Sequence, residues 1–116
     1  VNFTGDRIIN NFLKSNLNRY KNEKASIKIS LDVTSNYKKI ILTKDAAGKV
    51  DKYELITEVT FEANPGNKKF TFTEKKIMES KTKKSDERSY EIATKQTFAN
   101  IITNNLINQL ISFKWF

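Results

Sequence analysis

Carboxylates are the first candidates for chemistry, because the sequence contains no histidine and no cysteine. Glu54, Glu58 and Glu62 recur at every fourth position of a segment with strand-like alternation, so they should share one face. At that spacing along a strand, neighbouring carboxylates are roughly 13 Å apart, which is too far for them to share a metal ion. We therefore interpret the three glutamates as a solvated strand face and not as a metal or acid–base site.

Other residue types that support catalysis have no suitable partners. Without histidine or cysteine there are no thiolate nucleophiles, no Cys/His zinc sites and no Ser-His or Cys-His dyads. The serines and threonines have no base beside them, and the three glycines are isolated turn residues that form no phosphate-binding loop. The sequence thus indicates a protein that is not an enzyme and that needs no cofactor or metal.

The formal net charge of +8 leaves two interpretations open. A functional one is an anionic partner, such as nucleic acid, a membrane surface or an acidic lipid. The other is composition alone, since lysine, asparagine and isoleucine are abundant, as in an AT-rich genome. All but three of the 21 basic residues are lysines, and phosphate recognition favours the planar fork of arginine.

The lysines fall into three groups along the chain. One flanks the turn at Gly48, one follows the strand after the second turn, and one fills the loop before the last helix: Lys38, Lys39 and Lys44; Lys68, Lys69, Lys75 and Lys76; Lys81, Lys83 and Lys84. Each group alone is more typical of a solvated surface than of a site. Two of these loops at one end of a sheet could converge on an anion.

Nucleic-acid binding is the alternative function, because Phe70 and Phe72 lie on a basic strand and could form a stacking platform. Two observations weigh against it. The predicted helices are rich in asparagine and not in arginine, and the two phenylalanines share the parity of core residues. We therefore expect no nucleic-acid partner.

Hydrophobic periodicity gives the order of the elements. A chain of 116 residues suits one domain over residues 1–116. We predict a helix over 4–21 capped by Asp6 or Thr4, strands over 25–33, 52–63 and 68–80, and a closing helix over 87–113. Residues 36–45 are either a further strand or a continuation of the first, and NPGN at 64–67 is a tight turn.

One apolar face can be assigned to each element. We expect the inward residues to be Ile9, Phe12, Leu13, Leu17 and Tyr20; Ile27, Ile29, Leu31 and Val33; Tyr53, Leu55, Thr57, Val59, Phe61 and Ala63; Phe70 and Phe72; and Ile92, Phe98, Ala99, Ile102, Leu106, Leu110 and Phe113. Outward glutamates on 52–63 could pair with lysines on 68–80. Two amphipathic helices on one face of a roughly four-stranded antiparallel or mixed sheet make an α+β two-layer sandwich. The other face, with Lys, Glu, Ser and Thr, is expected to be solvated or docked to a partner.

The order and spacing of these elements resemble the LptE family, small outer-membrane lipoproteins of lipopolysaccharide transport. The likeness covers nearly the whole chain and is carried by GDRIINNFLKSNL, IKISLDV, AAGKVDKYELITEVTFEANPGNKKFTF and SDERSYEIATKQTFANIITNNLINQLISF. It implies two helices against a four-stranded sheet, a place on the periplasmic side of the outer membrane, and an LptD-like β-barrel in which the domain sits as a plug. It also implies binding of lipopolysaccharide.

In the family, basic residues near the glycine turn and just before the last helix are associated with contact to lipopolysaccharide. Carried over to this sequence, the second position falls on Lys84, with Lys83 beside it. At the first, Ala46 stands at the aligned place, and Lys44 is the nearest basic residue. The resemblance thus implies a lipopolysaccharide site at Lys44, Lys83 and Lys84.

The family also carries a lipid-bearing cysteine ahead of a first strand, and this chain has none. Val1, Asn2 and Phe3 look like the end of that strand. We expect that the lipid anchor and part of the N-terminal strand precede the sequence, and that the protein reaches the membrane through this anchor.

Overall fold

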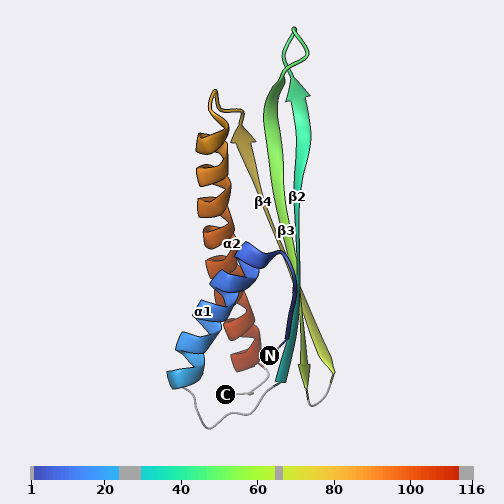
Figure 1. Ribbon diagram of the computed structural model, residues 1–116. Helices are drawn as coiled ribbons and strands as arrows, with labels where there is room; N and C mark the ends of the chain where they lie inside the picture. Colours follow the sequence, from blue (N-terminus) through green and yellow to red (C-terminus); the bar gives the residue numbers. More distant parts are fainter. Residues whose placement is uncertain (1, 24–29, 65–66, 113–116) are drawn as a thin grey trace.

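A long four-stranded sheet runs the length of the molecule, and both helices lie on the same side of it (Figure 1). The computed structural model describes residues 2–23, 30–64 and 67–112. Its elements are β1 (Asn2–Gly5), α1 (Arg7–Glu23), β2 (Ser30–Lys44), β3 (Val50–Asn64), β4 (Lys68–Glu79) and α2 (Lys84–Ser112). The strand order is β1-β2-β3-β4, with β1 parallel to β2 and the other pairs antiparallel. The predicted α+β fold with helices on one face of a mixed sheet is confirmed.

The polar stretch after Val33 does not break the strand. Of the segment predicted over 36–45, residues 36–44 continue the preceding strand, so that β2 is one element of 15 residues. Ser35 occupies an inward position of the strand and is buried. Its hydroxyl is satisfied there because it donates a hydrogen bond to Asn10 Oδ1 at 2.8 Å. Register shifts occur only near the end of β2, between Ile41 and Lys44.

The first helix begins later than periodicity predicted. Thr4 belongs to β1 and pairs with Thr34, so Thr4 cannot be the cap. Asp6 caps the helix, as predicted, because its Oδ1 accepts a hydrogen bond from Ile9 N at 2.9 Å. Gly5 makes the change of direction possible: it has a φ of +104°, and a Cβ there would overlap the carbonyl oxygen of Ser35.

The inner face of the sheet carries two apolar clusters. The larger joins α1 and the C-terminal half of α2 to the sheet around Phe61, and the smaller consists of Leu55, Met78 and Phe98. The strand faces were predicted correctly for Leu31 and Val33 and for the odd-numbered positions from Leu55 to Ala63. Tyr53 is half-buried and packs against the smaller cluster. Ile27, Ile29, Pro65, Gly66 and Phe113, and the side chain of Tyr20, lie outside the described part of the structure.

One helix position was predicted wrongly. Ile92 is 38% exposed, whereas Thr94 and Lys95 are buried on the face that meets the sheet. The N-terminal half of α2 faces the sheet through Tyr90 and a polar network described below, and the buried apolar residues of the helix start at Phe98. The helix also begins at Lys84, three residues before the predicted start at residue 87.

The far end of the molecule is an extension of two strands. The hairpin formed by β2 and β3 projects beyond the start of α2 and the end of β4 (Figure 1). The molecule measures 58 Å along its long axis and about 22 Å across. Within the described residues, neither helix has a stretch long and apolar enough to cross a membrane.

Candidate functional site

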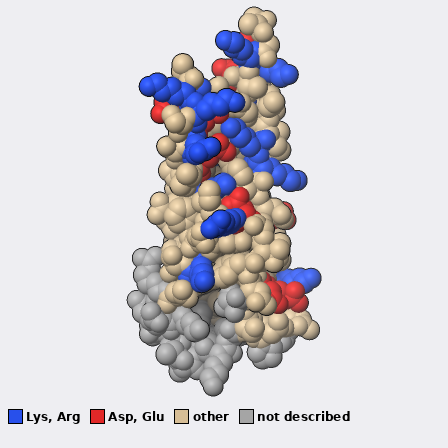
Figure 2. Space-filling view, viewed as in Figure 1, with Lys and Arg blue, Asp and Glu red and all other residues tan. Residues whose placement is uncertain are grey.

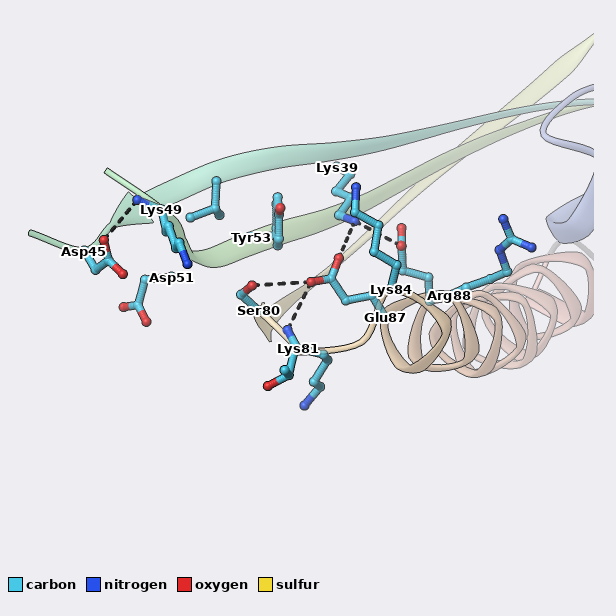
Figure 3. Close-up of a pocket in the computed structure, with 13 residues that line it drawn as sticks. Lys39, Asp45, Lys49, Asp51, Tyr53, Ser80, Lys81, Lys84, Glu87 and Arg88 are labelled. Atoms are coloured by element: carbon cyan, nitrogen blue, oxygen red, sulfur yellow. Dashed lines mark hydrogen bonds and ion pairs between the residues drawn. The ribbon is translucent and has the colours of Figure 1, made fainter. Parts of the chain in front are cut away.

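A polar cleft of about 820 Å³ opens at the hairpin end, between the base of the β2–β3 tip and the first turns of α2 (Figure 3). Its lining comes from the hairpin tip, from the loop after β4 and from one face of α2. The residues that line it are Lys39, Asp45, Lys49, Val50, Asp51, Tyr53, Ser80, Lys81, Thr82, Lys84, Glu87, Arg88 and Glu91.

Backbone and side-chain hydrogen bonds fix the two walls of the cleft. Asp45 shapes the hairpin tip, because its Oδ1 accepts hydrogen bonds from Ala47 N and Lys49 N, each at 2.9 Å. The loop after β4 is tied to the start of β3, since Ser80 N donates to Asp51 O at 2.9 Å. The base of the β2–β3 hairpin and the loop before α2 are therefore neighbours, although they are far apart in the sequence.

Glu87 holds the loop against the helix. Its carboxylate accepts hydrogen bonds from Lys81 N at 3.0 Å and Ser80 Oγ at 3.4 Å, and it pairs with Lys39 Nζ at 3.1 Å (Figure 3). The backbone hydrogen bond from Lys81 is the main reason that the pKa of Glu87 is lowered, with Lys39 and Ser80 adding to it against partial burial. This carboxylate is therefore charged at neutral pH and already has its partners.

Lys39, which lines the cleft, joins β2 to α2. Its Nζ pairs with Glu87 and, at 3.2 Å, with Glu91, and it lies 4.4 Å from the centre of the Tyr53 ring. Partial burial would lower the pKa of Lys39, but the hydrogen bonds and charges of the two glutamates outweigh it, so this pKa is raised. Lys39 thus has a structural role, and an incoming anion would have to compete with two carboxylates for it.

The polar network continues behind the cleft toward α1. Tyr37 donates its hydroxyl to Glu91 Oε1 at 2.6 Å, and burial followed by this hydrogen bond and the nearby negative charge raises its pKa. Lys95 Nζ lies 4.1 Å from the Tyr37 ring centre and 3.0 Å from Asp6 Oδ2. Ion pairs, a cation–π contact and the Tyr37 hydrogen bond therefore link the cap of α1 to the cleft.

Charges inside the cleft nearly cancel. Five basic residues line it against four acidic ones: Lys39, Lys49, Lys81, Lys84 and Arg88, and Asp45, Asp51, Glu87 and Glu91. Lys44 and Lys83 are exposed outside the cleft at the same end. Figure 2 shows the basic side chains gathered toward the end of the molecule that carries the hairpin tip and the start of α2. Such an end can attract an anionic surface without a deep basic pocket.

The three predicted site residues lie at this end but do not all share the cleft. Lys84 lines it, whereas Lys44, the last residue of β2, and Lys83, in the loop before α2, are exposed and do not. Within the described residues, none of the three makes an ion pair. The two loops therefore lie at the same end of the molecule, as expected, but only one of the three predicted lysines lines the cleft.

Sequence reasoning missed Lys49 and Arg88 as lining residues. Signals for both were available. Lys49 follows Gly48 in the same tight turn as Lys44, and Arg88 stands four residues after Lys84, which places the two on one face of a helix.

The other candidates do not form sites. On the wet face, Glu62 lies opposite Lys69, but Glu58 lies opposite Thr73 and Glu54 opposite Ile77. Only one of the three glutamates thus lies opposite a lysine of β4, and among the described side chains Glu62 and Lys69 form no ion pair. Phe70 is buried and Phe72 packs edge-on against Phe61, so they cannot serve as the stacking platform of the nucleic-acid alternative.

The same fold occurs in two lipoproteins. The rare lipoprotein B from Shewanella oneidensis superposes with a TM-score of 0.65 over 97% of both chains, at 13% sequence identity. A minor lipoprotein from Acinetobacter baumannii superposes with a TM-score of 0.59 over 90% of this chain and 91% of the other, at 18% identity. No protein-family model and no curated protein matches the sequence. At these identities the likeness establishes a shared fold.

Proposed function

We propose that this chain is an LptE-like, non-catalytic component of lipopolysaccharide transport that binds lipopolysaccharide through the end bearing Lys44, Lys83 and Lys84. The observation that carries the proposal is that residues of the β2–β3 hairpin and of the loop before α2 line one cleft at the same end of the molecule. The sequence resemblance implied a lipid contact from both segments. The full-length fold shared with two lipoproteins supports the same assignment.

Phosphorylated glycolipid suits the chemistry of this end. Exposed lysine ammonium groups present mobile point charges, which match a cluster of phosphates better than a single buried anion. The carboxylates inside the cleft discourage deep entry of a phosphate, so contact is expected at Lys84 on the opening and at Lys44 and Lys83 around it. Binding of this kind weakens as salt rises.

The rest of the molecule suits a plug inside an LptD-like barrel. Lys, Glu and Thr side chains occupy most positions of the wet face of the sheet, beside the exposed Ile40, Leu42 and Ile77, and this largely polar face is compatible with a polar lumen. In this proposal an N-terminal lipid anchor holds the protein to the periplasmic side of the outer membrane, and the domain has no catalytic role.

Charge reversal at the loop before α2 tests the lipid site. We expect Lys83→Glu/Lys84→Glu to weaken binding of purified lipopolysaccharide about tenfold at low salt, because two attractions become repulsions. Binding is measured by fluorescence with labelled lipopolysaccharide at several salt concentrations. The matched control is Lys14→Glu/Lys69→Glu, which makes the same charge change at exposed positions of α1 and β4 away from this end.

Each outcome decides the assignment. Equal loss in both double variants would show that net charge alone attracts the lipid, and an unchanged affinity in the folded Lys83→Glu/Lys84→Glu variant would remove the site. Circular dichroism and thermal melting establish that both variants are folded. The barrel partner is tested separately, by copurification with the LptD-type barrel from the same cells, and failure there would overturn the plug but not the lipid site.

A further inference from the structure

Half of β2 has an open edge within the described part of the structure. β1 pairs with β2 only from Asp32 to Ser35, because the chain leaves the sheet at Gly5 and enters α1. From Asn36 to Lys44, β2 pairs with β3 on one side, and no described strand covers the other. Figure 1 shows this upper part of β2 as the margin of the projecting hairpin. The backbone N–H and C=O groups along this open edge have no strand partner in the described part of the structure, and such an edge can pair with another strand.

The backbone groups that face outward can be identified. Ser35 O points to the β1 side, since it accepts a hydrogen bond from Asp6 N at 3.1 Å. In an antiparallel ladder the N–H and C=O of one residue point the same way, and the direction alternates. Tyr37, Lys39 and Ile41 therefore present their N–H and C=O groups to the open edge, and the register is regular as far as Ile41.

Apolar side chains gather on this edge. Ile40, Ile41 and Leu42 are consecutive and are 43%, 50% and 42% exposed. The opposite edge of the sheet, on β4, exposes Ile77 alone among its large aliphatic residues and carries Glu74 and Glu79 among its lysines. Three adjacent exposed aliphatic residues are the feature that natural edge strands usually avoid.

Charge decides what kind of strand fits. Residues 36–44 contain three lysines and no acidic residue, so antiparallel pairing of two copies would bring two basic stretches together. The whole chain adds a net charge of +8 to that repulsion. An acidic segment meets the opposite condition, especially beside Lys38, which points to the wet face and lies opposite Ile56.

We propose that the open edge of β2 binds an extended acidic segment of another protein by strand addition. In the bound state the segment pairs with the backbone of Tyr37, Lys39 and Ile41. Its aliphatic residues lie beside Tyr37 and Ile41, and an acidic residue lies beside Lys38. This partner surface is separate from the lysines assigned above to the lipid, apart from its end at Lys44.

The test uses a short synthetic peptide in which valines alternate with glutamates. Binding is followed by fluorescence anisotropy and by amide hydrogen exchange. We expect exchange to slow at Tyr37, Lys39 and Ile41 and to change little at Lys38 and Ile40, whose amides already face β3. A peptide N-methylated at alternate residues lacks the backbone N–H donors that would face β2, and it is expected not to bind.

A charge swap gives the matched control. Lys38→Glu is expected to weaken the glutamate peptide about fivefold and to strengthen a peptide with lysine in place of glutamate. Lys75 lies on the same face across β3, opposite the same Ile56, so Lys75→Glu makes an identical charge change at the other edge and is expected to leave binding unchanged. Equal effects of the two variants, binding of the N-methylated peptide, absence of binding, or dimers of the protein through this edge would each overturn the proposal.

Discussion

Asp6 is predicted to be the most important carboxylate for stability, because it serves two elements at once. One oxygen caps α1 through Ile9 N, and the other pairs with Lys95 Nζ on α2 at 3.0 Å. The side chains of Lys95 and Asp6 are only 11% and 17% exposed, so this pair is screened much less than an open surface pair.

Two substitutions at Asp6 separate its roles. Asp6→Asn keeps a good capping side chain but leaves Lys95 as a mostly buried cation without its counter-charge, which we expect to cost about 1–3 kcal/mol in the free energy of unfolding. Asp6→Ala also removes the cap, which adds about 1 kcal/mol. Urea denaturation at neutral pH measures both values. Asp86→Asn is the matched control, since Asp86 is an exposed carboxylate in the first turn of α2, and it should change stability by less than about 0.5 kcal/mol.

A double-mutant cycle with Lys95→Met tests whether the two residues are coupled. In the wild type, Lys95→Met removes the partner of Asp6 and is expected to destabilise the protein. In the Asp6→Asn background it removes an uncompensated charge, so it should restore most of the lost stability. If Lys95→Met has the same effect in both backgrounds, or if Asp6→Asn is as stable as the wild type, the reasoning is refuted.

Three further outcomes follow from the described contacts. Gly5→Ala should destabilise the protein by more than 2 kcal/mol (about the cost of strain plus steric overlap with Ser35 O), as measured by urea denaturation; equal stability would show that the turn can rearrange. Tyr37→Phe should cost about 1–2 kcal/mol in thermal melting, because Glu91 loses a buried donor but keeps Lys39; a neutral effect would mean that water replaces the hydroxyl. Because the pKa of Glu87 is lowered, its ionisation stabilises the fold at pH values above the ordinary pKa of 4.5, and this contribution is lost as the pH falls through the lowered pKa. Glu87→Gln should therefore reduce the loss of unfolding free energy at acidic pH, as measured by urea denaturation at several pH values. An unchanged dependence on pH would contradict this assignment.

Local periodicity was enough to predict the layers of the fold. The alternation from Leu55 to Ala63 identified the buried face of β3, because a strand with one dry side must place its apolar residues at every second position. The same reasoning failed for α2 before Phe98. There Ile92 is exposed and Lys95 is buried, and the burial of a lysine depends on Asp6, which no local pattern could connect to it.

The candidate site was predictable to a similar extent. The resemblance and the lysine groups located the end of the molecule that carries it, and Lys84 lines the cleft there. The carboxylates opposite could not be assigned, because Glu87 and Glu91 were visible only as polar positions of a helix. Their inward direction follows from the pairing with Lys39 and Tyr37.

That arrangement has a consequence for how an anion would bind. Lys39 is already paired with two carboxylates, so drawing it toward a phosphate would break ion pairs that hold α2 to β2. Lys84, in contrast, lines the cleft and makes no ion pair among the described residues, so it can turn to a ligand at no such cost. Substituting Lys39 should therefore lower stability first, and substituting Lys84 should lower lipid affinity with the fold intact. If substituting Lys39 lowered lipid affinity with the fold intact and substituting Lys84 lowered stability, the binding site would lie at Lys39 instead.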